Sequence, residues 1–323
     1  MFLKSISPRQ LENATRSFLA KFFPPAVVQD CLELIMYAEH RNKVGQGLLK
    51  LMGTEPLQAV KPDLAWQIDE KTKLSALIHG NKNPSFHVAQ VATRLCLEKA
   101  LEHGFGIIGV NGIYSSTGAL GYYVEKLANS GLIAFACARS PGAVSPFGLH
   151  VPLFGTNPFA WAFPTLQEPV VFDMATSAIT YYELVLAKMR GERIPPDVAV
   201  DKLGQLTDDP AAAMTGGILP FDKGYKGSAL SMMVEVLSGP LVNAAFCDYK
   251  SFDKDWGFLI FAFSPSLLTD SDQFKAAASD LTSIIRDHGA VVPGDNGRLF
   301  EKKIHVEGLM NVDDEIAELL MLS

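Results

Sequence analysis

The chain has 323 residues, of which 48% are hydrophobic and 20% are charged, a balance typical of globular proteins with one large or two interlocked domains. Its net charge is −7, and no basic cluster exceeds two adjacent residues. Because nucleic acids attract clustered cations, this pattern argues against a nucleic-acid-binding protein.

No apolar run near the start is long enough for a signal peptide, and none elsewhere approaches the roughly 20 residues of a membrane helix. The seven histidines do not pair with cysteines or acids at metal-ligand spacing, so we expect no metal site. The four cysteines lie far apart in apolar surroundings, and we expect them to be reduced core residues of a cytoplasmic protein: Cys31, Cys96, Cys137 and Cys247.

Hydrophobic periodicity, capping residues and turn signals divide the chain into helices and strands. We expect helices over about 14 residues from Pro8 and at 26–40, 87–102, 119–128, 178–190, 228–237, 271–288 and 313–320. We expect strands at 63–69, 74–79, 105–110, 132–138, 159–163, 169–172 and 257–263. The alternation of strands and helices from residue 85 to 263 indicates an α/β protein, with the two helical chain ends packed together as a second unit.

The stretch 155–177, GTNPFAWAFPTLQEPVVFDMATS, places Asp173 at the end of an apolar run. Two extended segments flank a turn, and a helix is expected to start at 173–176. An acid and two hydroxyls at a strand-to-helix junction suit a small polar ligand. An ordinary hairpin followed by a capped helix is the alternative for this stretch.

Residues 104–109 match the pattern G-x-G-x-x-G of dinucleotide-binding proteins. That fingerprint requires a strand, then the glycines, then a helix whose N-terminus faces the pyrophosphate. Here the order is helix, glycines, strand, so we do not expect these glycines to bind phosphate.

Three further features are polar or irregular enough to belong to a site. Lys226-Gly227 at an expected helix start could hold an anion through the ammonium and free backbone N–H groups. His150 lies in the loop before the 155–177 stretch. Residues 191–215 form a long polar excursion with little periodicity, which is typical of a surface or lid element.

Four motifs in order resemble the malate/L-lactate dehydrogenase family that lacks a Rossmann domain. They are FGTNPFAWAFP (154–164), VFDMATSAI (171–179), IPPDVAVDKLGQLTDDP (194–210) and GGILPFDKGYKGSALSMMVEVLSG (216–239). The family includes ureidoglycolate dehydrogenase, sulfolactate dehydrogenase, diketogulonate reductase and the piperideine- and pyrroline-2-carboxylate reductases. The resemblance covers roughly residues 8 to 310.

The resemblance implies a sulfolactate-dehydrogenase-like fold, in which an NAD(P)-binding α/β domain (81–244) is inserted into a discontinuous domain (1–80 plus 245–323). It also implies a homodimer and a nicotinamide cofactor, NAD(H) or NADP(H). The residues that it places at the cofactor are Ser140, Thr156, Asn157, Val170, Val171, Phe172, Asp173, Met174, Ala175, Thr176, Tyr225, Lys226, Pro293, Gly294 and Asp295. Asp173 is expected to lie close to the nicotinamide.

The substrate side departs from the family pattern. The family's general acid/base histidine falls on Gln46, its substrate-carboxylate arginine on Lys50, and its second histidine on Ser116. Glutamine cannot donate a proton at neutral pH, whereas a positioned acid typically accelerates such reactions 10²–10⁴-fold. Lysine keeps the positive charge of arginine without its bidentate fork.

Three hypotheses for the function follow from these departures. The chain could reduce a small carboxylated cyclic imine, which arrives already protonated; Gln46 and Ser116 would orient it and Lys50 would hold its carboxylate. It could instead act on a 2-oxo or 2-hydroxy acid with an atypical proton donor such as His40, His150 or a lysine. It could also be a catalytically altered homologue that binds the cofactor.

Overall fold

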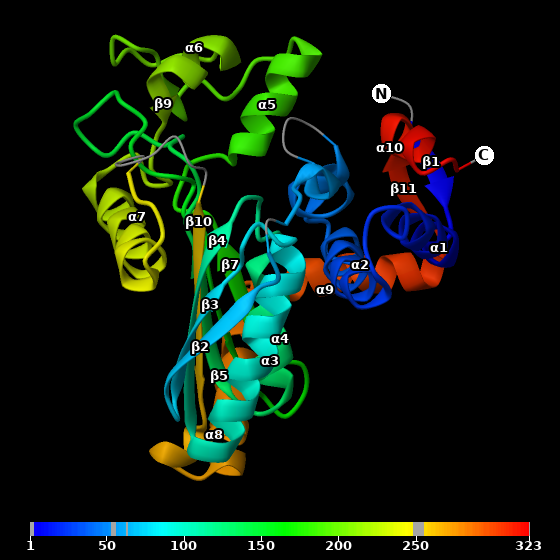
Figure 1. Cartoon of the computed structure of the whole chain (residues 1–323), viewed down its shortest axis with the longest axis vertical. Coiled ribbons are helices and arrows are strands. Elements are labelled where there is room, and N and C mark those ends of the chain that lie inside the picture. The colour runs from blue at the N-terminus through cyan, green and yellow to red at the C-terminus, as the bar shows by residue number, and fades with distance from the viewer. Residues whose placement is uncertain (1–2, 53–55, 63, 248–254, 323) are drawn as a thin grey trace.

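The computed structural model describes residues 3–52, 56–62, 64–247 and 255–322 (Figure 1). Within them, seven strands form one mixed sheet, which confirms the expected α/β class. The neighbouring pair β3–β4 is parallel, and the other described pairs are antiparallel. In spatial order the strands are β2 (Gln67–Thr72), β3 (Ser75–His79), β4 (Phe105–Ile113), β10 (Trp256–Phe263), β5 (Ile133–Ala138), β6 (Phe159–Phe163) and β7 (Val170–Met174). Asp63, where the first strand was expected to begin, lies outside the described residues.

Helices α3 (Ser85–His103) and α4 (Leu120–Asn129) cover one face of the sheet, and α7 (Tyr225–Ser238) covers the other (Figure 1). The G-x-G-x-x-G glycines serve this packing. A Cβ on Gly106 would lie 2.6 Å from the Cys96 carbonyl oxygen of α3, and one on Gly109 would lie 2.7 Å from the Val242 side chain. Gly104 ends α3 at φ 81°, so the order helix, glycines, strand is confirmed.

A helical unit joins the two chain ends. Strand β1 (Leu3–Ile6) pairs with β11 (Met310–Asp313), beside helices α1 (Pro8–Leu19), α2 (Pro25–His40), α9 (Asp295–Glu307) and α10 (Asp314–Leu319) (Figure 1). A capping box between Ser7 and Gln10 starts α1. The seven-stranded sheet takes β2, β3 and β10 from outside the expected 81–244 domain, so strands from both sides of those boundaries share one sheet.

A third region above the sheet contains α5 (Tyr181–Arg190), β8 (Ala199–Val200), α6 (Pro210–Gly216) and β9 (Gly217–Ile218) (Figure 1). The expected helix start at 173–176 is wrong. Val170 to Met174 pair with β6 and therefore stay extended, and Thr180 with Glu183 forms the capping box that starts α5. Much of the 191–215 excursion packs on a small core of this region, formed by Val144, Leu184, Ile194, Val198, Ala199, Ala213 and Ile218.

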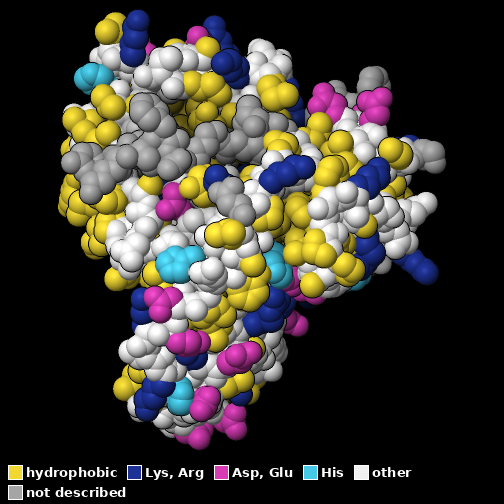
Figure 2. All heavy atoms as spheres, in the orientation of Figure 1, with side chains coloured by type: hydrophobic (Ala, Val, Ile, Leu, Met, Phe, Trp, Pro, Cys, Tyr) yellow, Lys and Arg dark blue, Asp and Glu magenta, His cyan; other side chains and the backbone are white. Residues whose placement is uncertain are grey.

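Helix α8 (Ser271–Asp287) lies at the far end of the sheet (Figure 1), and α9 directly follows the Pro293-Gly294 turn. Short 3-10 turns complete the structure at η1 (Val44–Gln46), η2 (Leu48–Leu51), η3 (Leu57–Ala59), η4 (Pro240–Val242) and η5 (Pro265–Leu267). None of the helices seen in the described ranges combines the length and apolarity needed to span a bilayer. Hydrophobic side chains gather on the α7 side of the surface in Figure 2, and the exposed ones on this helix are Tyr225, Met232, Met233 and Val236.

Candidate functional site

A cavity of about 230 Å³ lies between the helical unit and the β7 edge of the sheet. It is formed by the end of α2 and the residue Lys43, by α4, by β7, and by the turn that leads into α9. The lining residues are Tyr37, Arg41, Lys43, Glu125, Val171, Phe172, Asp173, Pro293, Gly294, Gly297 and Arg298.

Asp173 on β7 forms hydrogen bonds with both Lys43 and α4. Its Oδ2 accepts hydrogen bonds from Lys43 Nζ at 2.7 Å and from the Gly121 backbone N–H at 3.0 Å. Its side chain is 10% exposed, and that of Lys43 is 30% exposed. The carboxylate at the sheet edge therefore holds both the segment that follows α2 and the first turn of α4.

Two guanidinium groups, those of Arg41 and Arg298, also line the cavity. Arg41 bridges Glu125 at 3.0 Å and Glu301 at 3.4 Å, while Arg298 donates to the Pro169 carbonyl. The Nε atoms of Arg41 and Arg298 are buried and have no acceptor in the part of the chain described. Both guanidinium groups line the cavity, so their positive charge suits an anionic ligand such as a phosphate-bearing cofactor.

Five of the fifteen expected cofactor residues line this one cavity: Val171, Phe172, Asp173, Pro293 and Gly294. Their neighbour Asp295 opens α9 and accepts two hydrogen bonds from Arg286, at 2.9 and 2.8 Å. These hydrogen bonds hold the pKa of the Asp295 carboxyl below its ordinary value.

Another four of the expected residues lie around a buried ion pair beneath α7. Arg139 Nε donates to Glu235 Oε1 at 3.1 Å, and Asn157 Nδ2 donates to Glu235 Oε2 at 2.7 Å. Arg139 also donates to the Ser140 carbonyl. The Thr156 N–H donates to Ser140 Oγ at 3.3 Å, and the Thr176 hydroxyl donates to the Thr156 carbonyl at 3.1 Å.

The remaining expected cofactor residues are divided between β7 and α7. Val170 and Met174 are the first and last residues of β7, and Ala175 follows it. Tyr225 and Lys226 are exposed at the start of α7. The N–H groups of Gly224 and Gly227 both donate to Asp222 Oδ1 at 3.0 Å, so the Gly227 N–H expected to be free for an anion is already bonded.

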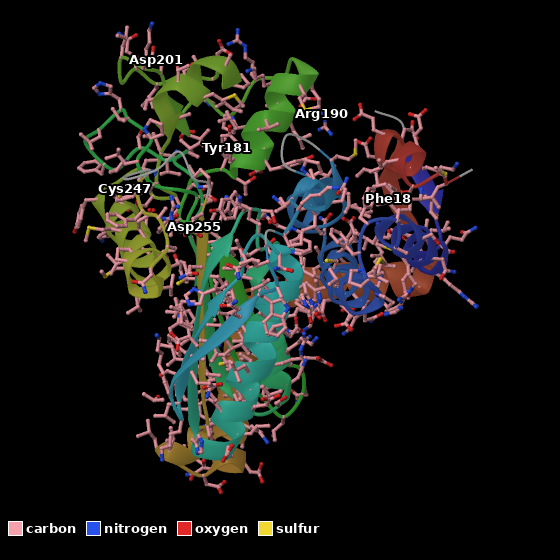
Figure 3. All side chains as sticks on the ribbon, viewed as in Figure 1. Phe18, Tyr181, Arg190, Asp201, Cys247 and Asp255 are labelled. Carbon is pink, nitrogen blue, oxygen red and sulfur yellow. The ribbon has the colours of Figure 1, made fainter. Side chains whose placement is uncertain are left out.

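On the substrate side, Gln46 and Lys50 lie on the 45–51 segment, which contains η1 and η2. The Gln46 N–H donates to the Lys43 carbonyl at 2.8 Å, and its side-chain amide makes no hydrogen bond within the described ranges. The Lys50 ammonium lies 5.4 Å from the centre of the Tyr182 ring, and a Cβ on Gly45 would lie 3.5 Å from the same ring. This segment thus faces the start of α5, where Figure 3 labels the neighbouring Tyr181.

Ser116, the other expected catalytic residue, lies in the loop before α4. Its Oγ accepts from the Gly118 N–H at 3.2 Å, and its carbonyl accepts from the Ser85 hydroxyl at 2.5 Å. The loop that carries Ser116 is therefore held in place by α3.

Sequence reasoning missed Lys43, which lines the cavity, and the two residues that contact the 45–51 segment, Glu39 and Tyr182. Glu39 lies in the last turn of α2, and its Oε1 accepts from the Leu48 N–H at 2.8 Å. Burial raises the pKa of the Glu39 carboxyl to about 7 against the opposing effect of this hydrogen bond. The sequence offered one clue to Glu39 and Lys43: both closely precede Gln46, where the chain departs from the family pattern.

The histidines considered as proton donors lie elsewhere. The His40 ring lies 6.3 Å from the His305 ring within the helical unit, and burial lowers its pKa. His150 is exposed, beside Gly204 in the third region. Neither lines the cavity, and the described residues contain no group of three or more metal-ligating side chains.

A family model described as malate/L-lactate dehydrogenase matches residues 6–321. L-sulfolactate dehydrogenase of Methanothermobacter thermautotrophicus is 37% identical over 261 residues, covering 79% of this chain and 76% of that protein. Delta(1)-pyrroline-2-carboxylate/Delta(1)-piperideine-2-carboxylate reductase of Pseudomonas aeruginosa is 33% identical over 309 residues, 90% of each chain. The crystal structure of the piperideine-2-carboxylate reductase of Pseudomonas syringae pathovar tomato has a TM-score of 0.86 at 27% identity, covering 99% of this chain and 100% of that one. The similarity therefore extends over nearly the whole chain, in sequence and in fold.

Proposed function

Because this chain belongs to the malate/L-lactate dehydrogenase family of oxidoreductases, we propose that it reduces a small carboxylated cyclic imine with a nicotinamide cofactor. The observation that carries the proposal is the contrast between the cofactor side and the substrate side of the candidate site. The cavity at β7 has the charged groups that a cofactor needs, while Gln46 stands where the family pattern has a proton-transfer histidine. Relatives named as pyrroline- and piperideine-2-carboxylate reductases support this choice of substrate class.

The cofactor would lie along β7 and the turn before α9. The guanidinium groups of Arg41 and Arg298 would face its phosphate oxygens, and Asp173 would lie near the nicotinamide end. When bound, a reduced nicotinamide supplies hydride to the substrate carbon. The charges that line the cavity favour an anionic ligand without selecting NADH over NADPH.

The substrate would lie over the 45–51 segment. Lys50 would hold its carboxylate, and the free amide of Gln46 would orient its ring together with Ser116. Hydride transfer to a ketone creates an alkoxide that requires an acid, whereas a protonated imine becomes a neutral amine. Glutamine in place of histidine is therefore compatible with imine reduction and costly for ketone reduction.

A second candidate is a 2-oxo acid or 2-hydroxy acid dehydrogenase with an atypical proton donor. The 37% identity to L-sulfolactate dehydrogenase favours it. Lys43 is the lysine best placed for such a role, because its ammonium lines the cavity.

The test is turnover of NADH or NADPH, followed at the nicotinamide absorbance band, with pyrroline-2-carboxylate, piperideine-2-carboxylate and pyruvate-like acids. We expect turnover of the imines at least tenfold faster than of the oxo acids. Turnover of oxo acids alone would reject the imine proposal in favour of the second candidate. Tight cofactor binding without turnover of any substrate would identify a catalytically altered homologue. Gln46→His is the matched variant, and it should raise oxo-acid activity specifically.

We also propose a cytoplasmic homodimer. Among the described residues the four cysteines form no disulfide, which suits a reducing compartment. The exposed apolar side chains of α7 offer a surface that a second copy could cover, because monomers rarely expose large apolar patches. Analytical ultracentrifugation tests the homodimer, and a monomer at micromolar concentration would contradict it.

A further inference from the structure

The two faces of the seven-stranded sheet are covered unequally. Helices α3 and α4 cover one face, whereas α7 lies beside only the upper half of the other (Figure 1). Side chains alternate between the two faces along each strand. Those on the α3–α4 face are small and buried in the main core, since Ala134, Ala160, Ala162 and Ala262 are each at most 1% exposed. The larger side chains of these strands therefore point to the α7 face.

A continuous row of aromatic rings crosses the α7 face on strands β4, β10, β5, β6 and β7, and we call it the aromatic floor. Neighbouring ring centroids in this row lie 4.7–6.4 Å apart. In order of contact, the rings are those of Phe105, Phe261, Trp161, Phe135, Phe159 and Phe172. Phe135 and Phe159 share a buried cluster with Val234 of α7, whereas Trp161 is 38% and Phe172 is 36% exposed. The aromatic floor thus begins beneath α7 and continues beyond it into solvent.

This composition does not suit a sheet face that stays in water. The neighbouring pairs among these five strands are antiparallel, and an antiparallel sheet with one solvated face normally places polar side chains on it. Here the side chains on the open half are aromatic. Large exposed apolar patches mark surfaces that another molecule covers.

Helix α7 forms a ridge beside the aromatic floor. Four large uncharged side chains of this helix, Tyr225, Met232, Met233 and Val236, are 44–64% exposed. Tyr225, Met232 and Val236 are separated by seven and four positions, which places them on one side of the helix. Methionine and aromatic residues are enriched, and charged residues depleted, at the centres of protein–protein interfaces.

We propose that two copies of this chain pair through this face, with the α7 ridge of each copy lying on the aromatic floor of the other. This inference rests on the homodimer proposed above and names its surface. Each chain carries the ridge and the floor side by side, so one twofold axis brings both pairs into contact at once. The ridge and the exposed part of the floor would bury on the order of 800 Å² per copy, which is the size of a standard stable interface.

Met232→Glu in the ridge and Trp161→Glu in the floor test the two halves of this interface. Each glutamate stays in water in the monomer, where these positions are 49% and 38% exposed, and becomes a buried unpaired charge in the dimer. We expect both variants to raise the dimer Kd at least about 100-fold in sedimentation velocity. Ile284→Glu is the matched control, because Ile284 is an apolar residue of α8 that is 56% exposed, and this variant should remain a dimer.

A dimer that survives either test variant would overturn this arrangement and leave the homodimer itself standing. A wild-type chain that is a monomer at micromolar concentration would contradict the homodimer as well.

Hydroxyl-radical oxidation of the wild type provides a second measurement that needs no variant. Met189 on α5 is 67% exposed and is the reference for Met232 and Met233, which are 49% and 48% exposed. In the dimer, the two ridge methionines should be oxidised at least about fivefold more slowly than Met189. The exposed Trp161 should be oxidised more slowly than the half-buried Trp66. Oxidation of these residues in the order of their exposure in the single chain would reject the proposal.

Discussion

The two sides of the site differ in how their polar groups are satisfied. At β7, Asp173 binds Lys43 and Gly121, and Arg41 is bridged to two carboxylates. On the 45–51 segment, the Gln46 amide has no bonded partner in the described ranges, and Lys50 lies on an aromatic face. The charged groups named at β7 are thus tied to other elements of the fold, whereas no described residue holds the Gln46 amide. The proposed cofactor side is thus the more constrained of the two, and the proposed substrate side is where this chain departs from the family pattern.

The largest effect should come from removing the charge buried beneath the cofactor side. Glu235→Ala leaves the Arg139 guanidinium, 1% exposed, without its carboxylate, and should lower the free energy of unfolding by about 3–5 kcal/mol. Urea denaturation measures this loss. Glu12→Ala, which breaks an exposed pair with Arg16, is the control and should cost less than about 1 kcal/mol. Equal losses in the two variants would mean that this network does not stabilise the cofactor side.

Glu39 should make stability on the substrate side depend on pH. Its pKa is raised in the folded state from 4.5 to about 7, so the folded protein binds the proton more tightly than the unfolded chain. This contribution is fully present below about pH 4.5 and is lost as pH rises through 7, a change of up to about 3 kcal/mol. Comparison of wild type with Glu39→Gln by denaturation from pH 4.5 to 8 isolates it. A constant difference between the two proteins would show that Glu39 has an ordinary pKa.

The ion pair at the cavity should couple the helical unit to the sheet. In a double-mutant cycle, Lys43→Met and Asp173→Asn should show a coupling of about 1–2 kcal/mol in the free energy of unfolding, because the pair is partly buried at 2.7 Å. Additive losses would show that the two groups stabilise their own elements independently. Asp173→Asn should also weaken NADH or NADPH binding, and unchanged affinity would place the cofactor elsewhere.

The smallest effect is expected at Lys50. Tyr182→Leu removes the ring beneath the ammonium, an interaction worth about 0.5–1 kcal/mol, so KM for the carboxylated substrate should rise roughly two- to fivefold. The matched control is Tyr181→Leu, since Tyr181 is exposed at the same helix start (Figure 3). Similar KM changes in both variants would mean that Tyr182 does not position Lys50.

Local patterns in the sequence predicted the elements more successfully than the site. Helix periodicity located α2 and α3, and the order of glycines and strand at 104–109 was correct. The motif resemblance gave the fold, which the structural neighbours confirm. The helix start expected at 173–176 was wrong because pairing with β6 keeps Asp173 and Met174 extended, and that pairing depends on a second strand.

The contacts that define the site join residues far apart in sequence. Lys43 and Asp173 are 130 positions apart, and Arg139 and Glu235 are 96 apart. Glu39 is close to Leu48 in sequence, but its raised pKa results from burial by the assembled fold. Periodicity and spacing do not predict contacts between residues so far apart. Sequence reasoning therefore identified the departure from the family pattern at Gln46 but not the residues that surround it.

The position of β10 has a consequence for how the protein is made. This strand lies between β4 and β5 in the middle of the sheet, yet it is the last of the seven in the chain. During synthesis, the edges of β4 and β5 that pair with β10 have no partner until more than a hundred further residues have been made. Unpaired strand edges attract other chains, so the interval before residue 256 emerges is when the nascent protein is most prone to aggregate and most in need of a chaperone.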